Sequence, residues 1–135
     1  MIDVVLYAVV EDGKILLEKR KDDEERYPGL WAMPSGHVEM EDKVSALMGE
    51  VNEETGLMPL KYMLLKTMPS DDGKSLLHIF VITEFAGETK QETGEGRKLQ
   101  WFSVEDARKV LTDSDFHNTT GLILAEVGKI VASQK

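Results

Sequence analysis

The sequence predicts a single α/β domain in which helices pack on the faces of a mixed β-sheet. The chain has 135 residues, which is enough for one hydrophobic core but not for two. Strand-like apolar runs and helical repeats follow one another in the order β-β-(β)-α-β-β-β-α-α. A sheet covered by helices is the simplest arrangement that buries the apolar side of every element. We therefore expect one domain over residues 1–135.

Two strands are expected near the start of the chain, at residues 2–10 and 14–19. They are apolar runs separated by Glu11-Asp12-Gly13, and an Asp-Gly pair supplies the positive φ angles of a tight hairpin turn. Residues 31–38 then predict a short strand or an extended segment broken at Pro34, because proline removes a backbone donor.

The clearest helix in the sequence begins after Asp42 and ends at Gly56. Its apolar side chains recur with the i, i+3, i+4, i+7 spacing of an amphipathic helix: Val44, Leu47, Met48 and Val51. Asp42 is a suitable N-cap, and Gly56 stands where a left-handed residue commonly ends a helix.

The second half of the chain predicts three more strands and two more helices. The strands are expected at residues 60–67, 75–85 and 99–102. A helix should start at Ser103, with Asp106 in the acidic position of a capping box. A last helix is expected from about Asn118, with one apolar stripe: Leu122, Val127, Ile130 and Val131.

Charge and composition exclude several classes of function. The formal net charge is −9, which argues against binding a nucleic acid duplex, because phosphate neutralisation needs clustered Lys and Arg. No apolar run reaches the length of a membrane span, and the N-terminus predicts a strand rather than a signal peptide. The chain has no cysteine, which is consistent with a cytoplasmic protein. A small phosphorylated ligand is compatible with this charge if a divalent cation lies between ligand and protein.

Three carboxylates crowd onto one side of the central helix: Glu50, Glu53 and Glu54. Each like-charged pair at i, i+3 or i, i+4 costs about 0.2–0.5 kcal/mol, and the helix dipole disfavours anions near its C-terminus. One interpretation is a solvated acidic face. The other is a metal site, because hard divalent cations such as Mg²⁺ and Mn²⁺ prefer carboxylate and carbonyl oxygens.

The segment around these glutamates resembles the signature of the Nudix hydrolases, the MutT-type pyrophosphohydrolases. That signature is G-x5-E-x7-R-E-U-x-E-E-x-G-U, where U is an apolar residue. The residues of this chain that match it are Gly36, Glu41, Glu50, Val51, Glu53, Glu54, Gly56 and Leu57. The preceding stretch PGLWAMPSGHVE and the later Gln100-Trp101-Phe102 before a helix are also similar to the family pattern.

The resemblance implies a Nudix-type α/β/α sandwich and a hydrolase that depends on Mg²⁺ (or Mn²⁺). It implies that Glu50, Glu53 and Glu54 bind the metal and that one of them orients or deprotonates the attacking water. The backbone carbonyl of Ser35 would be a further metal ligand.

The expected substrate-binding residues are Arg20, His37 and Glu95. Many family members have an arginine at the position of Arg20, although a surface cation is the alternative. His37 follows Gly36 and is placed to contact a phosphate oxygen, or else is a solvated loop residue. Glu95, or alternatively Glu92 of the same acidic loop, would replace the additional glutamate that many members carry there.

The chain departs from the family pattern at four places. Four residues, rather than five, separate Gly36 from Glu41, and Ser35 replaces a glycine. Gly49 takes the place of the arginine that braces the box carboxylates in the family, and Lys98 stands where many members have a glutamate. We therefore expect an active but slow enzyme.

The function expected from the resemblance is hydrolysis of a nucleoside diphosphate linked to another group X. A nucleoside triphosphate, cleaved to monophosphate and pyrophosphate, is the leading substrate. The alternatives are an ADP-ribose or nucleotide-sugar pyrophosphatase, a catalytically weak nucleotide-binding or regulatory module, and an acidic helix with no metal at all. A homodimer is possible, because the apolar strands after Leu60 fit either a core or an interface.

Overall fold

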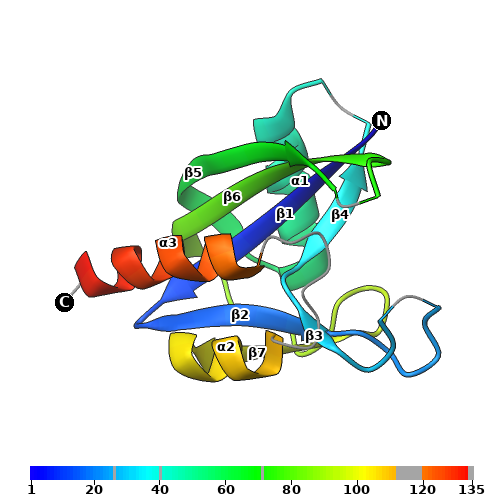
Figure 1. Ribbon diagram of the computed structural model, residues 1–135. Helices are drawn as coiled ribbons and strands as arrows, with labels where there is room; N and C mark the ends of the chain where they lie inside the picture. Colours follow the sequence, from blue (N-terminus) through cyan, green and yellow to red (C-terminus); the bar gives the residue numbers. More distant parts are fainter. Residues whose placement is uncertain (26, 40, 71, 112–119, 134–135) are drawn as a thin grey trace.

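The computed structural model describes residues 1–25, 27–39, 41–70, 72–111 and 120–133 (Figure 1). In chain order the elements are β1 (Ile2–Glu11), β2 (Lys14–Lys19), β3 (Trp31–Ala32), β4 (Ser35–Val38), α1 (Lys43–Thr55), β5 (Met58–Pro69), β6 (Ser75–Ala86), β7 (Lys98–Ser103), α2 (Val104–Leu111) and α3 (Thr120–Ser133). This order confirms the α/β class.

Strand β1 is the centre of the sheet. It runs parallel to β6, with partners from Ile2 with Ser75 to Val9 with Ile82, and antiparallel to β4 and β2. Strand β2 continues the sheet to β3 and β7, while β5 pairs with the far side of β6. Since parallel and antiparallel pairs occur together, the sheet is mixed.

Helices cover both faces of the sheet, as expected. Successive side chains of a strand point to opposite faces. The even-numbered residues of β1 from Val4 to Val10 pack with side chains of α2 and α3. The odd-numbered residues from Val5 to Val9 pack with Leu47 and Val51 of α1. Figure 1 shows α3 in front of the sheet and α1 behind it.

The local signals of the sequence form the elements that they predict. Asp12 and Gly13 have φ angles of 50° and 76° in the hairpin turn between β1 and β2. The Oδ1 atom of Asp42 accepts a hydrogen bond from the backbone N–H of Val44 at 3.0 Å, which caps α1. Gly56 ends α1 with a φ of 83°. The Oγ atom of Ser103 accepts from the N–H of Asp106 at 3.1 Å at the start of α2.

Two strand predictions are refined by the structure. The segment 31–38 forms two short strands, β3 and β4, that pair with different partners, β2 and β1. Of the two long apolar strands after α1, β6 supplies fully buried core residues, whereas β5 packs the partly buried Leu65 and Met68 against the core. Strand β5 is the sheet edge and leaves Leu60, Met63 and Leu64 about half exposed, at 55%, 50% and 53%.

None of the helices in the described part of the chain combines the length and the apolar character needed to cross a membrane.

Candidate active site

A polar cleft of about 540 Å³ lies where α1 faces β4 and the two loops that flank β2 and β7. Five of the seven site residues predicted from the sequence line it: Arg20, Ser35, His37, Glu50 and Glu95. The cleft is also lined by Gly36, Arg97, Tyr27 and Ser75. The tertiary structure therefore gathers residues from at least five separate segments of the sequence.

Glu50 reaches the cleft because Gly36 makes room for it. A Cβ atom placed on Gly36 would overlap the Glu50 carboxyl group. The pKa of Glu50 is raised to about 7, mainly because burial disfavours the charged form and further because Glu54, Glu53 and Glu95 are negative. A glycine in β4 is thus required for the position of this carboxylate.

Glu54 lies one turn after Glu50 and is more deeply buried. Its side chain is 8% exposed, and its Oε2 atom has no hydrogen-bond partner. Burial raises its pKa, and the charge of Glu95 raises it further, while Arg97 opposes both effects. A buried carboxylate oxygen without a partner is costly unless a proton or a cation meets it.

Glu53 differs from the other two glutamates because its side chain is exposed, whereas Glu50 lines the cleft and Glu54 is buried. Its backbone carbonyl accepts a hydrogen bond from Lys90 Nζ at 3.0 Å, and the N–H of Lys90 donates to the carbonyl of Thr55 at 2.8 Å. Lys90 therefore offsets the unfavourable end of the α1 dipole, which no Lys or Arg within the helix does. The carboxylates divide into an inward pair, Glu50 and Glu54, and an outward one.

Sequence reasoning missed a second buried acidic residue, Glu18 on β2. Its side chain is 1% exposed, and burial raises its pKa to about 8 even though Arg97 opposes the shift. Its Oε1 atom accepts from Arg97 Nη1 at 3.2 Å, while its Oε2 atom has no partner. The sequence carries no signal for this burial, because an acidic residue within a strand such as 14–19 normally predicts an exposed position.

Arg97 is the second residue that the sequence did not single out. Besides Glu18, it contacts the Oε2 atom of Glu95 through Nη1 at 3.5 Å. Arg97 thus supplies positive charge to the acidic cluster. The family pattern would place an arginine at the position of Gly49 for this purpose. Lys98 is exposed on β7 and pairs with Lys19, so the neighbouring arginine takes the inward position.

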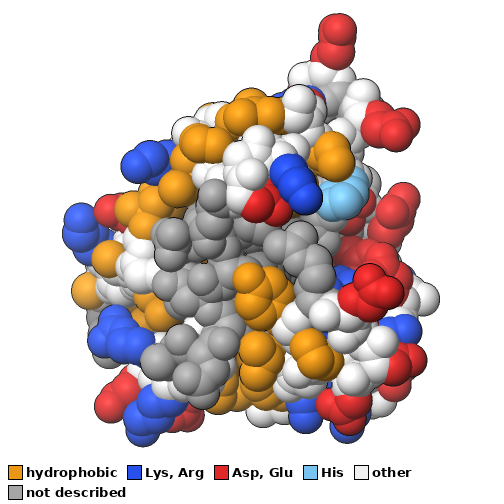
Figure 2. Space-filling view, turned by 45° about the vertical axis from the view of Figure 1, so that its right-hand side comes forward, with side chains coloured by type: hydrophobic (Ala, Val, Ile, Leu, Met, Phe, Trp, Pro, Cys, Tyr) orange, Lys and Arg blue, Asp and Glu red, His pale blue; other side chains and the backbone are white. Residues whose placement is uncertain are grey.

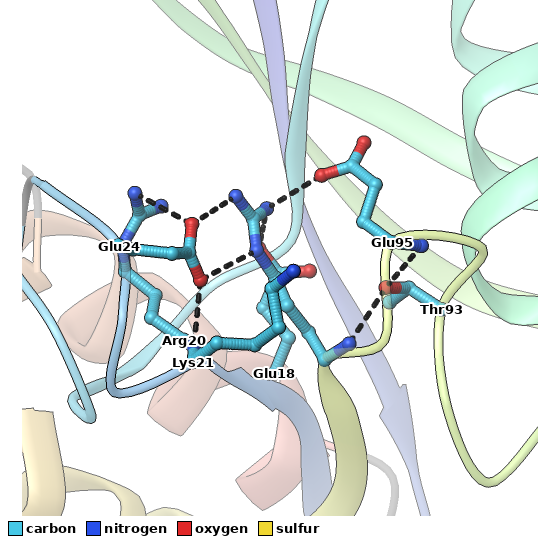
Figure 3. A network of polar contacts seen from close by, with 7 residues as sticks. Glu18, Arg20, Lys21, Glu24, Thr93 and Glu95 are labelled. Carbon is cyan, nitrogen blue, oxygen red and sulfur yellow. Dashed lines mark hydrogen bonds and ion pairs between the residues drawn. The ribbon is translucent and has the colours of Figure 1, made fainter.

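Arg20 and Arg97 both contact a single carboxylate, that of Glu24. Figure 3 shows the network around Glu24 from close by. Arg20 Nη2 lies 3.0 Å from Glu24 Oε1, and Arg97 Nη2 donates to the same oxygen at 2.6 Å. Arg97 Nε donates to Glu24 Oε2 at 3.2 Å. Because Arg97 holds it, Glu24 keeps a pKa below its ordinary value. Arg20 lies in the wall of the cleft, and His37 is exposed at its rim.

The donor set suits a hard divalent cation. In the described part of the chain, no three carboxylate or imidazole side chains are grouped closely enough to hold an ion as they stand. Mg²⁺ commonly uses only one or two carboxylates and completes its shell with water and substrate phosphates. The unpartnered oxygen of Glu54 and the raised pKa of Glu50 are what such an ion would relieve.

The net charge of the chain favours a ligand that brings its own cation. Acidic side chains gather along the right-hand side of the molecule in Figure 2, in keeping with the formal net charge of −9. A bare polyphosphate would meet repulsion here, whereas a metal-complexed phosphate would not.

Comparisons with known proteins point to one family. The NUDIX domain family matches residues 1–120 of this chain. Diphosphoinositol polyphosphate phosphohydrolase 2 of Rattus norvegicus is 38% identical over 89 residues, which cover 64% of this chain and 50% of that protein. The chain thus spans about half the length of the curated relatives it matches.

Solved structures share the fold. A MutT structure from work on Aliivibrio salmonicida and Vibrio cholerae superposes with a TM-score of 0.76 at 21% identity, over 93% of this chain and 98% of that one. The NUDIX domain of Shewanella oneidensis NrtR, complexed with ADP ribose, superposes with a TM-score of 0.71 at 18% identity, over 94% and 85%. At these identities the likeness establishes the architecture alone.

Proposed function

Because this chain belongs to the NUDIX domain family, we propose that it is a hydrolase that cleaves a phosphoanhydride bond of a nucleoside diphosphate linked to another group, with Mg²⁺ or Mn²⁺ as cofactor. The observation that carries this proposal is the inward pair Glu50 and Glu54 beside the cleft, with one buried carboxylate oxygen that lacks a partner.

Glu50, Glu53 and Glu54 are the proposed metal ligands, with the backbone carbonyl of Ser35 as a further oxygen at the cleft wall. The cation would neutralise the pyrophosphate, polarise the phosphorus and lower the pKa of a bound water. One glutamate accepts the proton of the attacking water. Glu50 is the proposed acceptor, since it lines the cleft.

A nucleoside triphosphate is the proposed substrate. Water attacks one phosphorus, the adjacent P–O–P bond breaks, and the products are the monophosphate, pyrophosphate and a proton. A cleft of about 540 Å³ is within the range of small-molecule sites. Tyr27 lines the cleft and offers an aromatic face to a base.

The relatives' names suggest a second candidate, a diphosphoinositol polyphosphate. Net charge argues against it, because such a ligand is densely phosphorylated and the chain carries a formal charge of −9. ADP-ribose or a nucleotide sugar is the remaining alternative within the enzyme class, and the ADP-ribose complex of a protein with the same fold is compatible with it.

The test is a substrate panel in Mg²⁺ or Mn²⁺ with the products identified. It contains nucleoside triphosphates, ADP-ribose, a nucleotide sugar and a diphosphoinositol polyphosphate. We expect nucleoside triphosphates to be turned over, and Glu53→Gln to abolish turnover while the protein stays folded. Glu105→Gln, an exposed change of the same kind on α2, is the matched control. Unchanged activity of Glu53→Gln would remove the metal assignment.

The panel also separates an enzyme from a nucleotide-binding or regulatory module. Metal-dependent binding of one nucleotide without any product would favour the module. Absence of Mg²⁺ and Mn²⁺ binding would return the glutamates to an acidic face without a metal.

A further inference from the structure

Two guanidinium groups converge on one carboxylate in the wall of the cleft. Arg20 and Arg97 both line the cleft, and both contact Oε1 of Glu24, at 3.0 Å and 2.6 Å. The three side chains are mostly shielded from solvent, with exposed fractions of 17%, 14% and 14%. Strong charge-assisted contacts of this kind are made where solvent competes poorly.

The nitrogens of Arg97 divide between two roles. Nη1 points inward to Glu18 at 3.2 Å and to Glu95 at 3.5 Å. Nε and Nη2 form the other edge of the fork, and both oxygens of Glu24 accept from it, at 3.2 Å and 2.6 Å. That edge matches a phosphate as well as it matches a carboxylate, because both present two oxygens in similar positions.

Glu24 lies in a loop, outside the helices and strands that form the cleft. Its segment lies between β2 and β3, and the described residues there form neither helix nor strand. Within the segment its carboxylate accepts from the backbone N–H of Lys21 at 2.6 Å, and its own N–H donates to the carbonyl of Lys21 at 3.3 Å. Its sequence neighbours Asp23 and Glu25 are exposed, so a displaced carboxylate would return to water.

We propose that Arg20 and Arg97 form a phosphate-binding site, that Glu24 occupies it in the absence of ligand, and that a phosphate of the substrate displaces Glu24. This inference rests on the proposed function, since it assigns one phosphate of that substrate a place in the cleft. Glu24 acts as an internal competitor, so it lowers affinity for every phosphate ligand. It also selects against singly charged anions, which gain too little from the arginines to replace a carboxylate.

The experiment is calorimetric titration of inorganic pyrophosphate with Mg²⁺ into the wild-type chain and three variants. Glu24→Gln removes the competing charge but keeps an oxygen for the N–H of Lys21, so the loop should stay folded. We expect it to bind pyrophosphate about tenfold more tightly, the lower end of what charged hydrogen bonds contribute. Glu25→Gln changes the net charge equally from an exposed position and should leave the affinity within about twofold, as expected for exposed charges.

The third variant, Glu24→Asp, separates occupancy from charge. It keeps the negative charge but is one methylene shorter, so it cannot hold both arginines, and it should also bind more tightly than wild type. If Glu24→Gln binds pyrophosphate equally or more weakly, Glu24 is a brace and the proposal is overturned. The proposal also falls if Glu25→Gln matches Glu24→Gln, if Glu24→Asp matches wild type, or if no variant binds pyrophosphate.

These outcomes are independent of the proposed reaction. If Glu24→Gln binds pyrophosphate more tightly but no nucleotide gives a product, the phosphate site is supported and the proposed hydrolase activity is rejected. Turnover of nucleotides without that gain would do the reverse.

Discussion

Adding one methyl group at Gly36 should disable the cleft while leaving the fold intact. In Gly36→Ala the new Cβ would lie 2.6 Å from Oε1 of Glu50, and closer still to the rest of its carboxyl group. Ordinary van der Waals contact begins at 3.4 Å, so the carboxyl group must move by about 0.8 Å or more. The obstacle is the end of a flexible side chain, and the backbone can stay in place.

A displacement of this size has a large expected effect on catalysis. A misplacement of about 1 Å in a catalytic constellation can cost about 100-fold in rate. We therefore expect kcat/KM for Mg²⁺-dependent nucleotide hydrolysis to fall by about 100-fold in Gly36→Ala. The free energy of unfolding, measured by chemical denaturation without metal, should change by less than about 1.5 kcal/mol, the cost of an off-rotamer side chain.

Gly49→Ala is the matched control. It is the same substitution in the residue before Glu50, but a Cβ there meets no atom within 4 Å. It should keep the activity and stabilise α1 by about 0.5–1 kcal/mol, because alanine is the better helix former. If Gly36→Ala stays as active as Gly49→Ala, then Glu50 does not need its present position and its assignment to the site is wrong.

Three further predictions concern charge and the metal. In Glu54→Gln without metal, Tm should rise, because a buried carboxylate with a raised pKa is removed. The increase in Tm on adding Mg²⁺ should be smaller in this variant than in the wild type. An equal increase would show that Glu54 is not a metal ligand. In metal-free buffer, the free energy of unfolding should fall as pH rises from about 5 to 8, by at most about 1.4 kcal/mol per unit for Glu18. The sign follows because the pKa of Glu18 is about 8 in the folded state against an ordinary 4.5, so the folded state still holds a proton that the unfolded state has lost. The unfolding free energy of Glu18→Gln, measured by denaturation at each pH, should therefore depend less on pH. An equal dependence in the variant and the wild type would contradict this. Gly49→Arg restores the family's arginine and should raise turnover only if the acidic cluster lacks positive charge. Arg97 already supplies positive charge to Glu18 and Glu95. We therefore expect Gly49→Arg to change kcat less than Arg97→Met does.

Local sequence signals were sufficient for the elements that carry the site. The boundaries of α1 follow from a capping aspartate and a terminal glycine, and each acts within four residues of its own position. The hairpin at Asp12-Gly13 is equally local. The helical period also places Glu50 and Glu54 on one side of α1 next to its apolar stripe, which is why both are shielded in the folded protein.

The partners of these glutamates could not be read in the same way. Arg97 meets Glu18 because β7 pairs antiparallel with β2 in a register that places Leu99 opposite Glu18, and the two residues are far apart in the chain. Nothing local distinguishes Arg97 from Lys98, yet one lies in the cleft and the other is exposed. The division between inward Glu50 and Glu54 and outward Glu53 depends on what packs against α1.

The sequence by itself determined the elements, the fold class and the presence of an acidic cluster, since these depend on residue periods and caps. Only the tertiary structure decided which charges face one another, that Glu18 is buried, and that Glu24 holds both arginines of the cleft. The physical reason is that electrostatic energy depends on distance and burial, and both are set by strand register and loop closure rather than by proximity along the chain.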